Sequence, residues 1–166
     1  MTNKEFFLSR LATEEKFSTD IIRTCSADSW DYSPHQRNRS AKELIGHFTA
    51  HLDDLIEAVE HGVINHRPML EFAAPEEAAR HYEASNKSLI EKIGALGDSE
   101  WNDKKVDFML FGKKLFALTI TEHCWHSLFG LIHHRGQLSA YLRPMGAVQT
   151  AVYGPTREQT ESMHGG

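Results

Sequence analysis

Two pairs of histidines offer the clearest chemistry in this sequence, because imidazole is the commonest metal ligand in proteins and an acid–base group near neutral pH. His133 and His134 are adjacent in one apolar segment, and His47 and His51 are four residues apart in another. Residues at that second spacing share one face of a helix. The pairs indicate a metal site between two helices, with hydrogen-bonded core histidines as the alternative.

Five histidines are candidates for such a site: His47, His51, His126, His133 and His134. Because successive residues point about 100° apart around a helix, the two adjacent histidines cannot both face one ion. Five others fall in loops, at helix ends, on an exposed face or in the tail, and we expect them outside the site: His35, His61, His66, His81 and His164.

Four amphipathic segments of helical period supply the elements that carry these side chains. We expect helices over about residues 3–25, 41–62, 75–96 and 117–142. The second begins at a capping box, Ser40 to Glu43, and stops at Gly62. A long connection follows it, and apart from a short hairpin around residues 106–116 no convincing sheet is indicated. The expected fold is all-α: a four-helix bundle over residues 1–150 as a single domain, then an extended tail over 151–166.

Composition narrows the class of protein. The formal net charge is −5, and Lys and Arg are scattered along the chain, which argues against nucleic acid as a partner. The first residues lack a signal-peptide pattern and no apolar run approaches about 18 residues, so we expect a cytoplasmic protein with no membrane partner. Cys25 and Cys124 form no CxxC motif, which fits a reducing compartment and argues against a thiolate zinc site.

Four other polar residues near the histidines have both a chemical and an ordinary interpretation. Arg135 is expected to pair with a carboxylate among residues 53–57 in preference to an anionic substrate. Gln137 is either a surface amide or an orienting partner for an imidazole. Glu122 fits a solvated helix residue better than a general base, and Cys124 fits a core residue better than a nucleophile.

Two motifs resemble the DinB-like family. The segments His133–Leu138, Tyr141–Gly146 and Tyr153–Pro155 are similar, in that order, to the family's C-terminal signature, and Arg39–His47 is similar to its second-helix motif. The resemblance implies a four-helix bundle with a long connection between helices two and three. It also implies a homodimer that holds a divalent metal with histidines of helices two and four.

The family pattern places one metal ligand at His47 and an H-x-x-x-H pair on the last long helix, whose second member matches His134. The first member falls at residue 130, which is Gly130 in this chain. His51, one turn after His47, is the replacement that completes the expected metal-ligand set of His47, His51 and His134, with space for water above Gly130. Zn²⁺ or Ni²⁺ suits these nitrogens better than Mg²⁺ or Ca²⁺. We assign no catalytic residue.

Two functions are compatible with such a site. The first is a metal-dependent enzyme, either a transferase that uses a low-molecular-weight thiol or a hydrolase, by analogy with members of the resembled family. The second is a non-catalytic helical homodimer, a stress-related binding or sensing protein with a degenerate metal site. The open position beside Gly130 favours the first function, whereas the missing ligand there favours the second.

Overall fold

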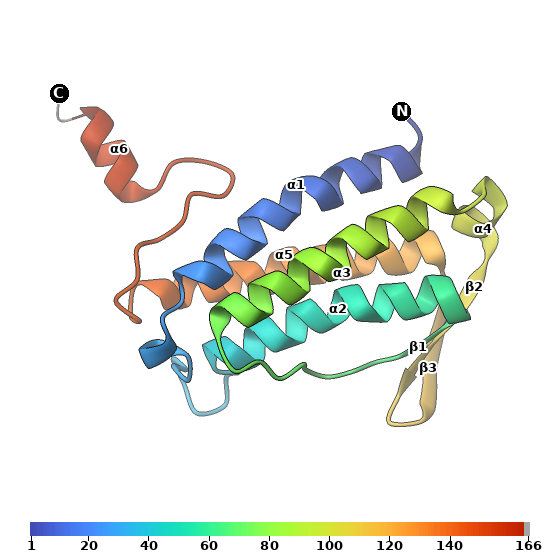
Figure 1. Ribbon diagram of the computed structural model, residues 1–166, viewed down its shortest axis with the longest axis horizontal. Coiled ribbons are helices and arrows are strands. Elements are labelled where there is room, and N and C mark those ends of the chain that lie inside the picture. The colour runs from blue at the N-terminus through green and yellow to red at the C-terminus, as the bar shows by residue number, and fades with distance from the viewer. Residues whose placement is uncertain (165–166) are drawn as a thin grey trace.

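The computed structural model describes residues 1–164, which form a bundle of four long helices with a small sheet at one end (Figure 1). The long helices are α1 (Asn3–Thr24), α2 (Ala41–His61), α3 (Pro75–Ala95) and α5 (Ile120–Leu142). The shorter elements are the 3-10 turn η1 (Ala27–Ser29), the helices α4 (Asp98–Asp103) and α6 (Arg157–His164), and the strands β1 (Val63–Asn65), β2 (Lys105–Leu110) and β3 (Lys113–Thr119). No helix within residues 1–164 has both the length and the apolar character needed to cross a bilayer. The predicted four-helix bundle is confirmed.

Local signals in the sequence set the ends of the helices that carry the histidines. At the start of α2, the Glu43 N–H donates to the Ser40 hydroxyl at 3.3 Å, and the Ser40 N–H donates to the Glu43 carboxylate at 2.8 Å. Thr119 and Glu122 form the same capping box at the start of α5, which gives Glu122 a structural role at the helix surface. Gly62 ends α2 in the left-handed conformation, with a φ of 71°.

Each long helix packs against two others: α1 and α2 both contact α3 and α5. Buried aliphatic and aromatic side chains fill the space between the helices, among them Phe7, Phe48, Tyr82 and Leu128. Removing this apolar surface from water is the main driving force for assembly of the bundle. Because α2 and α5 are neighbours, the two histidine-bearing segments face each other across one interface.

The sheet has the order β1-β2-β3. Strands β2 and β3 form the antiparallel hairpin predicted around residues 106–116, and the chain turns at Phe111 and Gly112, both with positive φ. Strand β1 pairs in parallel with β2, with Ile64 opposite Phe108. The expectation of no convincing sheet is therefore wrong. A three-residue strand has too short a pattern to recognise locally, and its partner lies far along the chain.

The long connection between α2 and α3 lies against α2. We call residues 66–72 the strap; Figure 1 shows it running along α2 from β1 toward α3. The N–H of Leu70 in the strap donates to the carbonyl of Gly46 in α2 at 3.1 Å. A β-carbon at Gly46 would lie 2.0 Å from the Leu70 carbonyl oxygen, so only glycine permits this approach.

The C-terminal segment is not simply extended, as the sequence had suggested. Residues Arg157–His164 form α6, while residues 165 and 166 of the expected tail lie outside the described range. Before α6, Tyr153 joins the segment to the bundle: its hydroxyl accepts a hydrogen bond from Arg135 at 2.6 Å and donates to the Glu14 carboxylate at 2.9 Å. Partners in two helices thus hold this part of the chain in place.

Candidate metal centre

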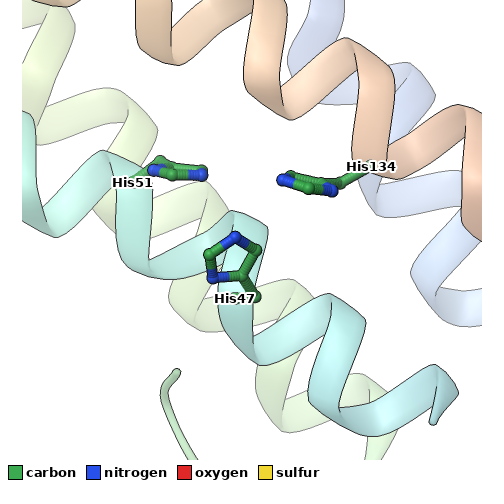
Figure 2. A group of neighbouring side chains, drawn as sticks. All are labelled: His47, His51 and His134. Carbon is green, nitrogen blue, oxygen red and sulfur yellow. The ribbon is translucent and has the colours of Figure 1, made fainter. Parts of the chain in front are cut away.

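Three histidines meet between α2 and α5. His47 and His51 come from α2 and His134 from α5, and their rings point toward one common space (Figure 2). The ring centres are 4.9 Å apart for His47 and His51, 4.6 Å for His47 and His134, and 5.9 Å for His51 and His134. One ring nitrogen of each lies within 4.8 Å of one nitrogen of each other ring. The structure therefore brings together the three side chains selected from the sequence.

Hydrogen bonds fix the protonation of two of these rings. The His47 Nδ1 lies 2.7 Å from the Pro68 carbonyl oxygen in the strap. Since a carbonyl oxygen can only accept, Nδ1 carries the proton and Nε2 keeps its lone pair. The His134 Nδ1 lies 2.9 Å from the Gln137 side-chain oxygen, which gives the same arrangement and identifies Gln137 as an orienting partner. Outer hydrogen bonds of this kind are typical of metal-binding imidazoles.

Burial keeps the three imidazoles uncharged at neutral pH. Desolvation lowers the pKa of His47 from its ordinary 6.5 to about 4, opposed by the hydrogen bond to Pro68. It lowers the pKa of His51 to about 3, and the neighbouring histidines add to the shift. Burial also lowers the pKa of His134. A metal ion binds the neutral imidazole, so no proton has to be displaced from these rings at pH 7.

Position 130 faces the same space. A β-carbon built on Gly130 would lie 3.8 Å from the His51 Nε2, an ordinary contact distance. A side chain at position 130 would therefore reach the site, as the H-x-x-x-H spacing with His134 indicated, but glycine has none. No side chain of residue 130 therefore covers the His51 Nε2.

The remaining histidines lie partly in places that the sequence did not predict. His126 and His133 are exposed, and neither joins a metal-capable group among the described residues. His123, which sequence reasoning overlooked, is buried and its Nε2 donates to the Val106 carbonyl at 3.0 Å, which ties α5 to β2. His66, expected to lie outside the site, has its ring centre 6.0 Å from that of His47 and 5.9 Å from that of His51.

Asp54 links His66 to the site. Asp54 follows His51 by three residues and so lies on the same face of α2. In the structure the Asp54 Oδ2 accepts a hydrogen bond from the His66 Nδ1 at 2.6 Å. The nitrogens or oxygens of His51, Asp54 and His66 form a second group within 4.8 Å of one another.

Arg135 and Cys124 have roles away from the histidines. Arg135 does not pair with a carboxylate of residues 53–57: its buried guanidinium forms an ion pair with Glu14 of α1. That partner was not recognisable locally, since the two residues are far apart in the chain. Cys124 is fully buried, and burial raises the pKa of its thiol, which stays protonated and inert.

The DinB family model matches residues 1–164. The chain belongs to the DinB family. The protein YjoA of Bacillus subtilis (strain 168) is 23% identical to this DinB chain over 157 residues, which are 92% of this chain and 97% of YjoA.

Two solved structures have the same fold as this DinB chain. The crystal structure of YjoA, a DinB-like protein, superposes with a TM-score of 0.67 at 19% identity, covering 89% of this chain and 96% of that one. The crystal structure of a DinB-like protein from Bacillus cereus ATCC 10987 superposes with a TM-score of 0.73 at 16% identity, covering 90% and 97%. At these identities the likeness establishes the fold, whereas chemistry has to be argued from the site.

The side chains of this DinB protein fit a divalent transition metal. The set offers neutral nitrogens from two rigid helices, and for His47 and His134 the free atom is Nε2. Nitrogen donors of this kind suit Zn²⁺ or Ni²⁺, whereas Mg²⁺ and Ca²⁺ prefer oxygen. The three histidines could therefore hold a metal ion.

Proposed function

We propose that this protein binds one divalent transition-metal ion, Zn²⁺ or Ni²⁺, through His47, His51 and His134, and acts as a metal-dependent enzyme. The observation that carries the proposal is the convergence of three uncharged imidazoles from α2 and α5, with ring nitrogens within 4.8 Å of one another. His47 and His134 each have an oxygen acceptor at Nδ1, so the Nε2 lone pair of each ring is free to bind a cation. One bound ion would use a nitrogen of all three rings.

A polar hollow next to the histidines supports a catalytic function. It has a volume of about 500 Å³, and it is lined by Arg37, Asn38, Arg39, Leu44, Gln137 and Tyr141. Gln137 joins the hollow to the site, since its side-chain oxygen accepts from His134. The positive charge of Arg39 contributes to the lowered pKa of both His47 and His134, which places that charge near the site. The hollow suits a small substrate with an anionic group.

The reaction class we propose is transfer to or from a low-molecular-weight thiol, or hydrolysis. When bound, the ion would polarise a substrate oxygen or lower the pKa of a bound water or thiol. The residues of the chain hold and orient: the Pro68 carbonyl and Gln137 keep the Nε2 atoms of His47 and His134 free, and Gly130 leaves space for the reacting group. Arg37 and Arg39 would attract the anionic part of the substrate.

Metal content is the first test. We expect about one Zn²⁺ or Ni²⁺ per chain in protein purified without chelators, and loss of that ion in the double variant His47→Ala, His134→Ala. The matched control is His81→Ala, because His81 is a half-exposed histidine that bonds the Asp53 carboxylate and lies on α3, outside the group of His47, His51 and His134. Equal metal content in the double variant and the wild type would contradict the proposal.

Activity is the second test. Metal-loaded protein, chelated protein and reloaded protein are assayed against a panel of thiol-transfer and hydrolysis substrates. We expect activity that is lost on chelation and restored on reloading. If chelation lowers only the melting temperature and no substrate turns over, the result supports the non-catalytic binding or sensing protein instead.

We also propose that the protein is a homodimer in the cytoplasm. Phe6 and Phe129 are exposed aromatic residues, 45% and 63% accessible, and each packs 5.8 Å from Trp125, so they form one aromatic patch over α1 and α5. Both cysteines are free and buried, which fits a reducing compartment. Light scattering of the wild type and of Phe129→Ser tests the dimer: the variant should shift toward the monomer, and an unchanged mass would exclude this patch.

A further inference from the structure

His66 has the same hydrogen-bond arrangement as the histidines expected to hold the metal. Its Nδ1 lies 2.6 Å from the Asp54 Oδ2, and the side chains are only 11% and 3% exposed. A carboxylate oxygen accepts, so the His66 Nδ1 donates and its Nε2 keeps the lone pair. His47 and His134 also have an oxygen acceptor at Nδ1. A carboxylate–histidine pair of this kind is a recurrent support for a metal-binding imidazole.

The position of His66 is held from several sides. Its backbone N–H donates to the Met109 carbonyl at 3.0 Å, which anchors the start of the strap to the sheet. Its ring lies 5.2 Å from the Phe108 ring, centre to centre. The other Asp54 oxygen accepts from the Arg67 N–H at 3.4 Å. These contacts fix the imidazole before any ion binds, which is the preorganisation that a ligand requires.

The distances from the His66 ring to the rings of His47 and His51 are those of an imidazole at the edge of a coordination sphere. With Zn–N bonds of about 2.0 Å, imidazoles that share one tetrahedral ion have ring centres about 5 Å apart. The ring of His66 is 5.9 Å from that of His51 and 6.0 Å from that of His47, close to the 5.9 Å between His51 and His134. One ring nitrogen of His66 also lies within 4.8 Å of one ring nitrogen of His51.

We propose that His66 is a fourth protein ligand of the metal centre and that Asp54 is its orienting carboxylate. The inference rests on the proposed metal binding by His47, His51 and His134. The orienting role explains why Asp54 is buried beside these histidines. His66 supplies from the strap the fourth nitrogen that Gly130 does not supply from α5.

The experiment counts nitrogens in the intact protein. X-ray absorption of the Zn²⁺-loaded wild type should give four imidazole ligands per ion, and His66→Ala should give three. In competition with a chromophoric chelator, we expect Zn²⁺ affinity to fall about 10–100-fold in Asp54→Asn and by at least as much in His66→Ala. The control variant is His81→Ala, because His81 also pairs with an aspartate, Asp53, but belongs to neither group of metal-capable side chains, and it should leave the affinity unchanged.

Each result decides between named alternatives. Three imidazoles in the wild type, or full affinity in His66→Ala, would overturn the role of His66 while leaving the three-histidine site intact. Two ions per wild-type chain would also overturn it, because His51, Asp54 and His66 would then form a separate site. A wild type that binds no Zn²⁺, Ni²⁺ or Co²⁺ removes the proposed function together with this inference. The wild-type ligand count does not depend on the folding of any variant, which circular dichroism checks separately.

Discussion

Replacing Gly46 by alanine should damage both the fold and the metal centre, although the same change in a helix usually stabilises. The added β-carbon would lie 2.0 Å from the Leu70 carbonyl oxygen and 2.9 Å from a side-chain carbon of Met69. The strap must therefore move away from α2. That movement breaks the hydrogen bond from Leu70 to Gly46 and withdraws the Pro68 carbonyl from the His47 Nδ1.

The magnitude follows from these contacts. Losing a backbone hydrogen bond costs about 1 kcal/mol, and leaving the His47 N–H without an acceptor costs about 1–3 kcal/mol. Steric overpacking adds about 1–3 kcal/mol, while the better helix propensity of alanine returns about 1 kcal/mol. We expect a net loss of about 2–6 kcal/mol in the free energy of unfolding. For a chain of this length, that lowers the melting temperature by about 4–24 °C.

The assay is urea denaturation of metal-free protein followed by circular dichroism, with Gly136→Ala as the matched control. Gly136 is an exposed glycine of α5, and a β-carbon there would meet nothing within 4 Å, so that variant should gain about 1 kcal/mol. Zn²⁺ affinity of Gly46→Ala should fall about tenfold, because His47 loses its orienting partner. If Gly46→Ala is as stable as Gly136→Ala, the close contact between the strap and α2 is refuted.

Three further predictions concern charge, burial and the open position. The folded-state pKa values of His47 and His51 lie at about 4 and 3, below the ordinary 6.5, so the unfolded chain takes up protons first as the pH falls. Metal-free protein should lose about 2 kcal/mol for each of the two histidines, or about 4 kcal/mol together, between pH 7 and pH 5; equal urea midpoints at the two pH values would contradict this. Arg135→Ala leaves the Glu14 carboxylate buried without its cation and should lower the free energy of unfolding by about 3–5 kcal/mol, measured by thermal denaturation. A loss below about 1 kcal/mol would show that the ion pair contributes little to stability. Gly130→His places an imidazole toward His51 and should tighten Zn²⁺ binding about tenfold, or about 1.4 kcal/mol, in a chelator competition. Unchanged Zn²⁺ affinity would mean that position 130 does not reach the ion.

Much of the bundle was predictable because its signals are local. The capping box at Ser40 and Glu43 and the left-handed Gly62 give the ends of α2 within one residue of the expected range. The apolar spacing of each segment gives the buried face, and the i,i+4 spacing places His47 and His51 together. These features depend on neighbours within one or two helical turns, and the same neighbours are present in the folded protein.

The errors share a different cause. Arg135 was expected to pair with α2 but pairs with Glu14 of α1, and His66 was placed outside the site but lies beside His51. Strand β1 was missed because it pairs with residues more than forty positions away in the chain. In each case the partner comes from another element, and spacing along the chain carries no information about which surfaces pack together.

The sequence by itself determined the four long helices, the family and the face on which the two α2 histidines lie, because helical periodicity and capping act over a few residues. Tertiary structure decided which side chains surround the candidate metal centre. The approach of the strap to Gly46 brings the Pro68 carbonyl to His47, and pairing of β1 with β2 holds His66 against Asp54. Those contacts arise only when the whole chain has packed, since each joins segments that no local pattern relates.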